Sequence, residues 1–253
     1  MSTQLPDPNK EFSGRRAVVT GGSRGIGAAI AQRLLDGGAT VVVTARSRNE
    51  AIPEGATFIT GDVRTNKGAK ALADEALRVL GGVDILVNNA GASRVYLQGS
   101  ASIPDEEWQD SLDINFLSAV RVTNAFLSAL KESKAGAVVN ISSGAAIAPA
   151  ASLLHYLAAK SALNTYSRGL AHELAPHKIR VNVVTPGLVI TPGADEIRKV
   201  FTDALGVPIE KIMPVPLGRP GQPHDIADLV AFLVSDRAAW ITAQNYFVDG
   251  GGA

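Results

Sequence analysis

The sequence predicts an α/β fold in which a parallel sheet is covered by helices on both faces. Short, continuous runs of β-branched residues alternate with longer helical patterns, as expected for strands that are buried on both sides. Nearly half of the residues are apolar (46%) and few are aromatic (5%), which suits Val- and Ala-rich strands and helices better than a β-sandwich. This alternation is typical of a doubly wound parallel sheet.

The strands and helices follow each other in a regular order. Strands are predicted at residues 17–20, 40–44, 57–60, 85–88, 137–141 and 179–184. Helices are predicted at residues 25–36, 66–80, 105–131 and 152–175. The connection over residues 46–56 is short and contains Pro53, so we expect a turn there in place of a crossover helix.

No linker, internal repeat or low-complexity tract divides the 253 residues, so we expect a single domain over residues 1–253. Residues 1–12 are expected to form a frayed N-terminal tail. The segment 188–217 breaks the alternation with prolines and glycines around an amphipathic helix. It is either a substrate lid or an ordinary surface excursion packed on the core.

Composition excludes several classes of function. The formal net charge is zero, which argues against a general binder of nucleic acid or of membrane surfaces. The sequence has no cysteine, so disulfides, thiolate metal sites and thiol nucleophiles are excluded, and we expect no metal. No apolar run is long enough to cross a bilayer, and the first ten residues lack the layout of a signal peptide. We therefore expect a cytoplasmic protein.

Tyr156 and Lys160 are four residues apart in an Ala-rich helical run, so their side chains share one face. Lowering the pKa of a phenol from ~10 to about 7 requires roughly 4 kcal/mol. An ammonium about 4 Å away supplies roughly that much at an effective dielectric of about 20. Burial opposes the shift, so a further positive charge such as an oxidised nicotinamide would help. The same spacing is common in ordinary amphipathic helices, so other motifs must support an acid/base role.

The first predicted strand leads into a helix through a glycine-rich turn, Thr20-Gly21-Gly22-Ser23-Arg24-Gly25-Ile26-Gly27. Glycines allow a tight turn and a close approach to a pyrophosphate, which then meets the free N–H groups of the helix. The spacing Gly-x-x-x-Gly-x-Gly differs from the commoner dinucleotide fingerprint. The order of strand, turn and helix still favours phosphate binding.

The same turn also satisfies a nucleophile elbow, Gly-x-Ser-x-Gly, with Ser23 as the nucleophile of a serine hydrolase. An elbow after the first strand leaves no earlier strand to supply an oxyanion loop. This alternative also gives Tyr156 and Lys160 no role. A third hypothesis is a nucleotide-binding protein without turnover.

The end of the second predicted strand, Thr44-Ala45-Arg46-Ser47, indicates which nucleotide is bound. An NAD site would have Asp or Glu there to bind the ribose hydroxyls. Arg46 and Arg24 are instead both available to bind a 2′-phosphate, which favours NADP(H) over NAD(H).

These residues resemble the short-chain dehydrogenase/reductase family over nearly the whole chain. The matching motifs are Thr20-Gly21-x-x-x-Gly25-Ile26-Gly27, Asp62-Val63, Asn88-Asn89-Ala90-Gly91, Asn115, Ser142-Ser143, Tyr156-x-x-x-Lys160, Pro186-Gly187 with Thr191, and Asp249-Gly250-Gly251. The resemblance implies a Rossmann-type fold and reversible hydride transfer between a nicotinamide and a ketone or secondary alcohol. One departure is Ala243, where many relatives have glycine before the last strand.

The resemblance also implies the catalytic roles. The spacing to the tyrosine selects Ser143 over Ser142, and its hydroxyl would polarise the substrate oxygen. Tyr156 would exchange a proton with that oxygen. Lys160 would hold the nicotinamide ribose and lower the Tyr156 pKa, while Asn115 would anchor a water that links Lys160 to solvent.

The remaining expectations concern binding residues and assembly. The predicted cofactor-binding residues are Gly21, Ser23, Arg24, Ile26, Gly27, Arg46, Ser47, Asp62, Val63, Asn89, Ala90, Gly91, Tyr156, Lys160, Pro186, Gly187, Val189 and Thr191. The predicted substrate contacts are Tyr96, Ala145, Leu153, His155 and Phe201. Most residues around this mouth are apolar, which favours a hydrophobic ketone or alcohol. The family resemblance implies a homotetramer or homodimer.

Overall fold

The structure is a computed structural model that describes residues 10–146, 151–206 and 215–252. Its sheet has seven parallel strands in the order β3-β2-β1-β4-β5-β6-β7. The predicted α/β, Rossmann-type fold is confirmed. The strands are β1 (Arg16–Thr20), β2 (Thr40–Ala45), β3 (Thr57–Thr60), β4 (Ile85–Asn88), β5 (Ala137–Ile141), β6 (Arg180–Pro186) and β7 (Asn245–Val248).

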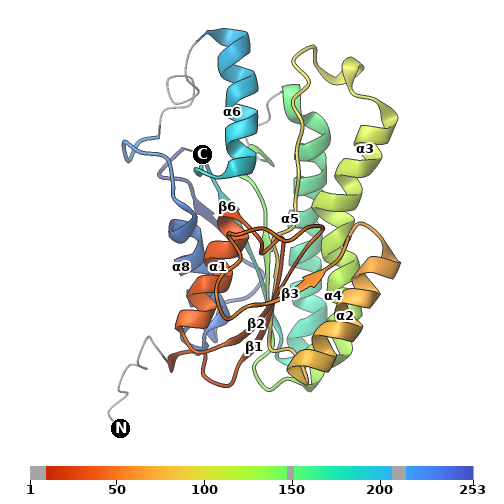
Figure 1. Ribbon diagram of the computed structural model, residues 1–253, viewed down its shortest axis with the longest axis vertical. Helices are drawn as coiled ribbons and strands as arrows, with labels where there is room; N and C mark the ends of the chain where they lie inside the picture. The colour runs from red at the N-terminus through yellow and green to blue at the C-terminus, as the bar shows by residue number, and fades with distance from the viewer. Residues whose placement is uncertain (1–9, 147–150, 207–214, 253) are drawn as a thin grey trace.

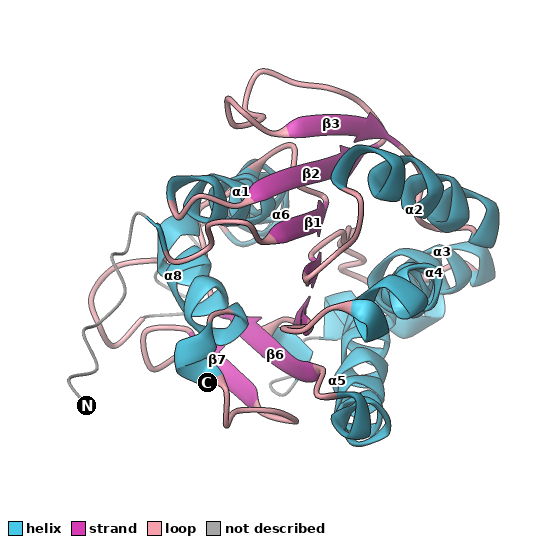
Figure 2. Ribbon diagram, turned by 90° about the horizontal axis from the view of Figure 1, so that it is seen from below, coloured by secondary structure: helices cyan, strands magenta, loops and turns pink. Residues whose placement is uncertain are grey.

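Helices cover both faces of the sheet (Figures 1 and 2). On one face lie α1 (Gly25–Asp36) and α8 (Pro223–Val234), and on the other lie α2 (Asn66–Leu80), α4 (Ser118–Glu132) and α5 (Leu154–Leu174). Neighbouring strand residues serve opposite faces, since Val19 packs in the core under α1 and α8 and Val18 in the core under α2, α4 and α5. Both faces must therefore be apolar, which explains the continuous hydrophobic runs of the sequence.

The long helix expected over residues 105–131 follows a continuous helical path with a local change of pitch. It comprises α3 (Asp105–Leu112), a π-helical stretch (Asp113–Leu117) and α4. Such π-helical stretches often occur at functional sites. Asn115 lies in this stretch and is buried.

Two elements were not located by the sequence patterns, namely α8 and β7. The helix α8 begins with a capping box in which Gln222 and Asp225 bond each other's backbone N–H groups, and Pro223 occupies its first turn. The connection over residues 46–56 contains turns and no helix, as expected. Within the predicted tail, Phe12 is fully buried, so the packed part of the chain begins before residue 12.

The segment 188–217 contains α6 (Pro192–Leu205), which extends beyond the carboxyl ends of the strands (Figure 1). Thr191 caps it, because its hydroxyl accepts a hydrogen bond from the backbone N–H of Ala194 at 3.1 Å. Residues 207–214 of the predicted lid lie outside the described residues. None of the helices in the described ranges is long and apolar enough to span a membrane.

Candidate active site

The turn after β1 is held against the end of β4 by side-chain hydrogen bonds. The Thr20 hydroxyl accepts hydrogen bonds from the backbone N–H groups of Asn89 (3.0 Å) and Ala90 (3.1 Å). The Asn89 side-chain amide donates to the carbonyls of Thr20 (3.0 Å) and Gly21 (3.1 Å). A Cβ at Gly27 would collide with the Gly21 carbonyl and with the Asn89 amide, so only glycine fits there.

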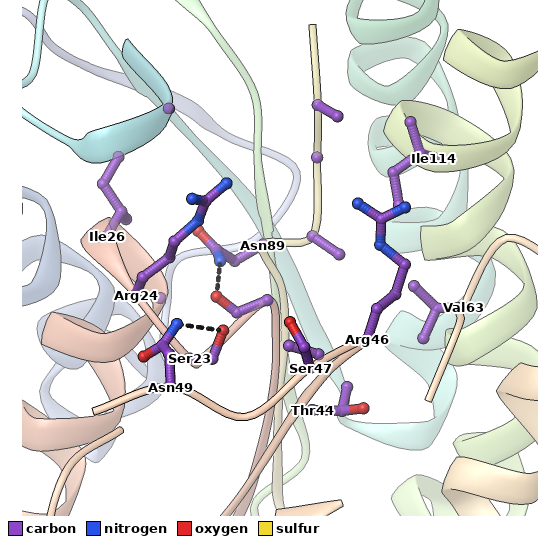
Figure 3. A pocket seen from close by; sticks show the side chains of 18 of the residues that line it. Ser23, Arg24, Ile26, Thr44, Arg46, Ser47, Asn49, Val63, Asn89 and Ile114 are labelled. Atoms are coloured by element: carbon purple, nitrogen blue, oxygen red, sulfur yellow. Dashed lines mark hydrogen bonds between the residues drawn. The ribbon is translucent and has the colours of Figure 1, made fainter. Parts of the chain in front are cut away.

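This turn forms one side of a pocket of about 400 Å³ at the carboxyl ends of the strands (Figure 3). Open α/β sheets bind ligands at this edge. The pocket is lined by thirteen of the predicted cofactor-binding residues, namely Gly21, Ser23, Arg24, Ile26, Gly27, Arg46, Ser47, Asp62, Val63, Asn89, Ala90, Gly91 and Thr191. Other lining residues were not predicted to bind, among them Thr44, Asn49, Arg64, Ile114 and Gly193.

Some of the lining residues that were not predicted could have been found from the sequence, and others could not. Ala45 and Gly61 also line the pocket and directly precede the predicted positions Arg46 and Asp62 at the ends of β2 and β3, so strand ends are a usable local signal. Asn49 gave no such signal; its amide donates to the Ser23 hydroxyl at 3.4 Å across the turn (Figure 3).

Two exposed arginines lie in the pocket, Arg24 at the start of α1 and Arg46 directly after β2. Figure 3 shows their side chains on opposite sides of the pocket, with Ser47 between them. Among the described residues that line this pocket, Asp62 supplies the one carboxylate, and it follows β3 rather than β2. The end of β2 is therefore positive.

Ser143 and Tyr156 lie within hydrogen-bonding distance of each other. The Ser143 hydroxyl bonds the Tyr156 phenol, and this contact favours the ionised phenol by lowering its pKa. The same hydroxyl accepts a hydrogen bond from the backbone N–H of Ala145 at 3.3 Å. The neighbouring Ser142 is buried in the sheet, where its N–H donates to the Val184 carbonyl at 2.8 Å. Of the two serines, Ser143 is thus the one that bonds Tyr156, whereas the Ser142 hydroxyl has no hydrogen-bond partner among the described residues.

Lys160 and Asn115 both lie close to Gly91. A Cβ built on Gly91 would lie 3.0 Å from Asn115 Oδ1 and 3.5 Å from Lys160 Nζ. Asn115 is fixed by two bonds to Ala92, donating to its carbonyl at 2.7 Å and accepting from its N–H at 3.0 Å. The buried Lys160 ammonium donates to the Ile141 carbonyl at 2.8 Å.

Burial dominates the electrostatics of Tyr156 and Lys160. Burial raises the pKa of Tyr156 above its usual value, and the Ser143 hydrogen bond offsets only part of this shift. Burial also lowers the pKa of Lys160 to about 8. The lowering of the Tyr156 pKa that the resemblance implies for Lys160 stays a prediction, which must overcome the desolvation of the phenolate.

The family of the chain follows from its similarity to known proteins. Residues 21–252, nearly the whole chain, match the protein family described as enoyl-(acyl carrier protein) reductase. The chain is also 36% identical over 246 residues to 3-oxoacyl-[acyl-carrier-protein] reductase FabG of Escherichia coli, covering 95% of this chain and 98% of that protein. The chain belongs to the short-chain dehydrogenase/reductase family.

Further relatives of this short-chain dehydrogenase/reductase support the same family. An uncharacterized oxidoreductase of Methylorubrum extorquens is 38% identical over 253 residues, with 95% of this chain and 98% of the relative covered. A solved short-chain dehydrogenase/reductase from Brucella melitensis has a TM-score of 0.86 and 33% identity, with 97% and 99% covered. Levodione reductase has a TM-score of 0.88 and 28% identity, with 95% and 98% covered. The protein is therefore an oxidoreductase of this family.

Membership in the short-chain dehydrogenase/reductase family leaves the serine hydrolase hypothesis without support. The Ser23 hydroxyl accepts a hydrogen bond from Asn49, and no histidine is among the described residues that line its pocket. A serine nucleophile requires an adjacent base, and the described lining of this pocket offers Ser23 none.

The remaining predicted positions of this short-chain dehydrogenase/reductase lie outside the pocket lining. Pro186 ends β6, and Gly187 follows it in close contact with Asp249. Val189 is buried and its backbone pairs with Gly221. Tyr156 lies beside Ser143, and Lys160 lies beside Gly91.

The predicted substrate contacts are spread over several elements. Ala145 and Phe201 are half-buried on the loop after β5 and on α6, and Leu153 is buried in front of α5. Tyr96 packs edge-on against His155, with ring centres 5.5 Å apart. The His155 side chain is fully buried, so a direct substrate contact of this residue does not fit the structure.

Proposed function

We propose that the protein is an NADP(H)-dependent oxidoreductase that interconverts a ketone and a secondary alcohol. The observation that carries this proposal is the Tyr156 phenol bonded to Ser143, with Lys160 one helical turn further, at the strand-end edge that also holds the glycine-turn pocket. A half-buried phenol that stays protonated at neutral pH is suited to donate a proton to a carbonyl oxygen.

The pocket fits a nicotinamide dinucleotide. Gly27 leaves room for a close approach beside Gly21 and Asn89, at the N-terminus of α1, where free N–H groups favour a pyrophosphate. Asp62 and Val63 would contact the adenine, and Asn89 to Gly91 the ribose. Pro186, Gly187, Val189 and Thr191 would hold the carboxamide and pyrophosphate. When bound, the cofactor supplies or accepts the hydride.

The end of β2 supports NADP(H) over NAD(H). A 2′-phosphate needs positive charge and hydrogen-bond donors, which Arg46 and Ser47 provide at this point of the pocket. Arg24 lies across the pocket, so it would have to reach toward the same phosphate from the start of α1. A carboxylate that would repel this phosphate is missing from Thr44 to Ser47.

The side chains divide the work on the substrate. Ser143 would donate a hydrogen bond to the substrate oxygen and polarise the carbonyl. Tyr156 would give its proton to that oxygen during reduction and regain it during oxidation. Lys160 would bind the nicotinamide ribose, and Asn115, fixed to Ala92, would hold a water that connects Lys160 to solvent.

The residues around the predicted substrate mouth restrict the class of substrate only broadly. Ala145, Leu153 and Phe201 offer apolar surface near the predicted mouth, which favours a hydrophobic ketone or alcohol. The two named relatives, 3-oxoacyl-[acyl-carrier-protein] reductase and levodione reductase, have different substrates in their names, so the substrate class must be measured. A homotetramer or homodimer and a cytoplasmic location stay predictions.

The test begins with NADPH fluorescence on binding, followed by NADPH consumption with a panel of ketones, oxidised hydroxysteroids, keto-sugars and a 3-oxoacyl thioester. Tyr156→Phe should lose at least ~10² of the turnover rate, because it lacks the acid/base hydroxyl, and should keep cofactor affinity nearly intact. Binding without any turnover by the wild type would favour a non-catalytic nucleotide-binding protein. Wild-type turnover by Tyr156→Phe would refute the proposed mechanism.

A further inference from the structure

A buried carboxylate with two partners lies beside the proposed active site and outside the cofactor pocket. It belongs to Glu107 on α3, which is buried although a carboxylate is costly to bury without partners. One carboxylate oxygen accepts a hydrogen bond from Arg94 Nη1, and the other lies 3.5 Å from His155 Nε2. Glu107 is thus shared between two segments that are far apart in the sequence.

The two segments are the ones that frame the reacting groups. Arg94 belongs to the loop after β4, which continues from the proposed ribose contact Gly91. His155 lies in the first turn of α5 and directly precedes Tyr156. A backbone hydrogen bond also joins these segments, since the Tyr96 N–H donates to the Ser152 carbonyl at 2.9 Å.

Aromatic rings close the cluster around the histidine. Tyr96 and Trp108 both pack edge-on against His155, with ring centres 5.5 Å and 6.2 Å away. The His155 side chain is therefore wedged between the loop and α3, while Tyr156 points from the same helical turn toward Ser143. Any shift of His155 moves the backbone that carries Tyr156.

We propose that Glu107 is a positioning residue, which, through Arg94 and His155, holds the loop of residues 92–97 and the first turn of α5 at the separation that catalysis requires. This inference rests on the proposed function and assigns Glu107 no contact with the substrate. Losing the carboxylate leaves Arg94 unpaired and His155 without its charged neighbour, so the two segments separate. A misplacement of about 1 Å is enough to cost ~10²-fold in rate when it affects reacting groups.

An effect of Glu107 on catalysis can be distinguished from an effect on NADPH binding, because Glu107 and its partners lie outside the cofactor pocket. None of Arg94, Tyr96, Glu107 or His155 is among the described residues that line it. Glu107→Gln keeps the size of the side chain and removes its charge. Arg94→Gln removes the guanidinium that pairs with Glu107 and leaves the carboxylate in place. Both variants should lower kcat on the best ketone of the panel at least about tenfold, with KM and the NADPH Kd changed by less than about twofold.

Two further variants test whether the pair acts as a unit. Arg94→Lys keeps a cation and should recover most of the kcat lost in Arg94→Gln. The double variant Glu107→Gln/Arg94→Gln should lose no more kcat than Glu107→Gln alone. The matched control is Asp74→Asn, which breaks the exposed ion pair with Lys70 on α2 and should leave kcat unchanged.

Hydrogen exchange provides a readout that does not depend on turnover. Glu107→Gln should speed amide exchange at Tyr96 and in the first turn of α5 together, and leave the turn of residues 21–27 unchanged. If Glu107→Gln exchanges faster but the wild type turns over no substrate, the proposed function is refuted and the positioning contact is supported. A lower melting temperature with wild-type kcat, KM and exchange in both segments would overturn the inference, as would a parallel loss of NADPH affinity.

Discussion

The Lys160 ammonium lies 5.9 Å from the centre of the Tyr156 ring, and burial shifts the pKa values of the two groups in opposite directions. The pKa of Lys160 falls to about 8 and that of Tyr156 rises. At neutral pH both groups therefore carry a proton. This is the state that carbonyl reduction needs, because the phenol can donate a proton while the ammonium is charged.

The pH dependence of ketone reduction follows from these shifts. As the pH rises through about 8, Lys160 loses its proton and with it the positive charge that favours proton release from Tyr156. We expect kcat/KM to be level from about pH 6 to pH 7 and to fall above about pH 8. The measurement is kcat/KM from NADPH consumption over this range. The residual activity of Lys160→Met should lack the falling limb, and an identical limb in that variant would exclude Lys160 as its source.

Cofactor selectivity is tested at the end of β2. Arg46→Asp should weaken NADPH binding at least about tenfold, because a carboxylate would face the 2′-phosphate, while NADH binding should be kept or improved. Arg48→Asp is the matched control, since Arg48 lies over the Phe58 ring and not in the pocket lining. Fluorescence titration of both variants with both cofactors gives the comparison. Equal NADPH affinity in Arg46→Asp and the wild type would contradict the phosphate assignment.

Stability at low pH depends on Asp84, at the opposite end of the sheet from the site. Its carboxylate accepts hydrogen bonds from the Arg16 guanidinium at 2.9 Å and from the Ser133 hydroxyl at 2.6 Å. These partners outweigh burial and lower the Asp84 pKa to about 2. A lowered pKa stabilises the fold above the pKa of the unfolded state, and the gain is lost as the pH falls through the folded value.

For Asp84→Asn we expect a free energy of unfolding roughly 2 to 3 kcal/mol below that of the wild type at neutral pH. The difference should shrink as the pH falls from about 4 toward 2, because the wild type then loses the same charge. Urea unfolding at several pH values measures both effects. Asp74→Asn, in an exposed pair with Lys70, should change stability by less than about 1 kcal/mol. A pH-independent difference for Asp84→Asn would speak against the ionised pair.

The sequence predicted the first six strands because each is a continuous run of apolar and β-branched residues, and all of them except the edge strand β3 are mostly buried. It did not locate β7, which is short, lies at the sheet edge and alternates exposed Asn245 and Phe247 with half-buried Tyr246 and Val248. It also missed α8, although the capping pair Gln222 and Asp225 is a local signal that marks its start.

The part of the candidate site that lies at the strand ends could be predicted from the order of the strands. Strand ends converge on one edge of a parallel sheet, so Gly21, Arg46, Asp62 and Asn89 come together from a pattern of strands alone. The rise of the Tyr156 pKa was not predictable in the same way, because it depends on how deeply packing buries the phenol. The contact between Glu107 and His155 likewise depends on tertiary packing of two helices.

Ala243 carries the last prediction, since its backbone has φ 61°, in the left-handed region. Its N–H donates to the Val181 carbonyl at 2.8 Å, which holds this conformation in front of β7. A left-handed conformation costs an L-residue roughly 1 to 2 kcal/mol, part of which the higher chain entropy of glycine offsets. Ala243→Gly should therefore raise the free energy of unfolding by about 0.5 to 1 kcal/mol. Ala239→Gly, where φ is −57°, should lower it instead, and urea unfolding that shows the same sign for both variants would contradict the backbone explanation.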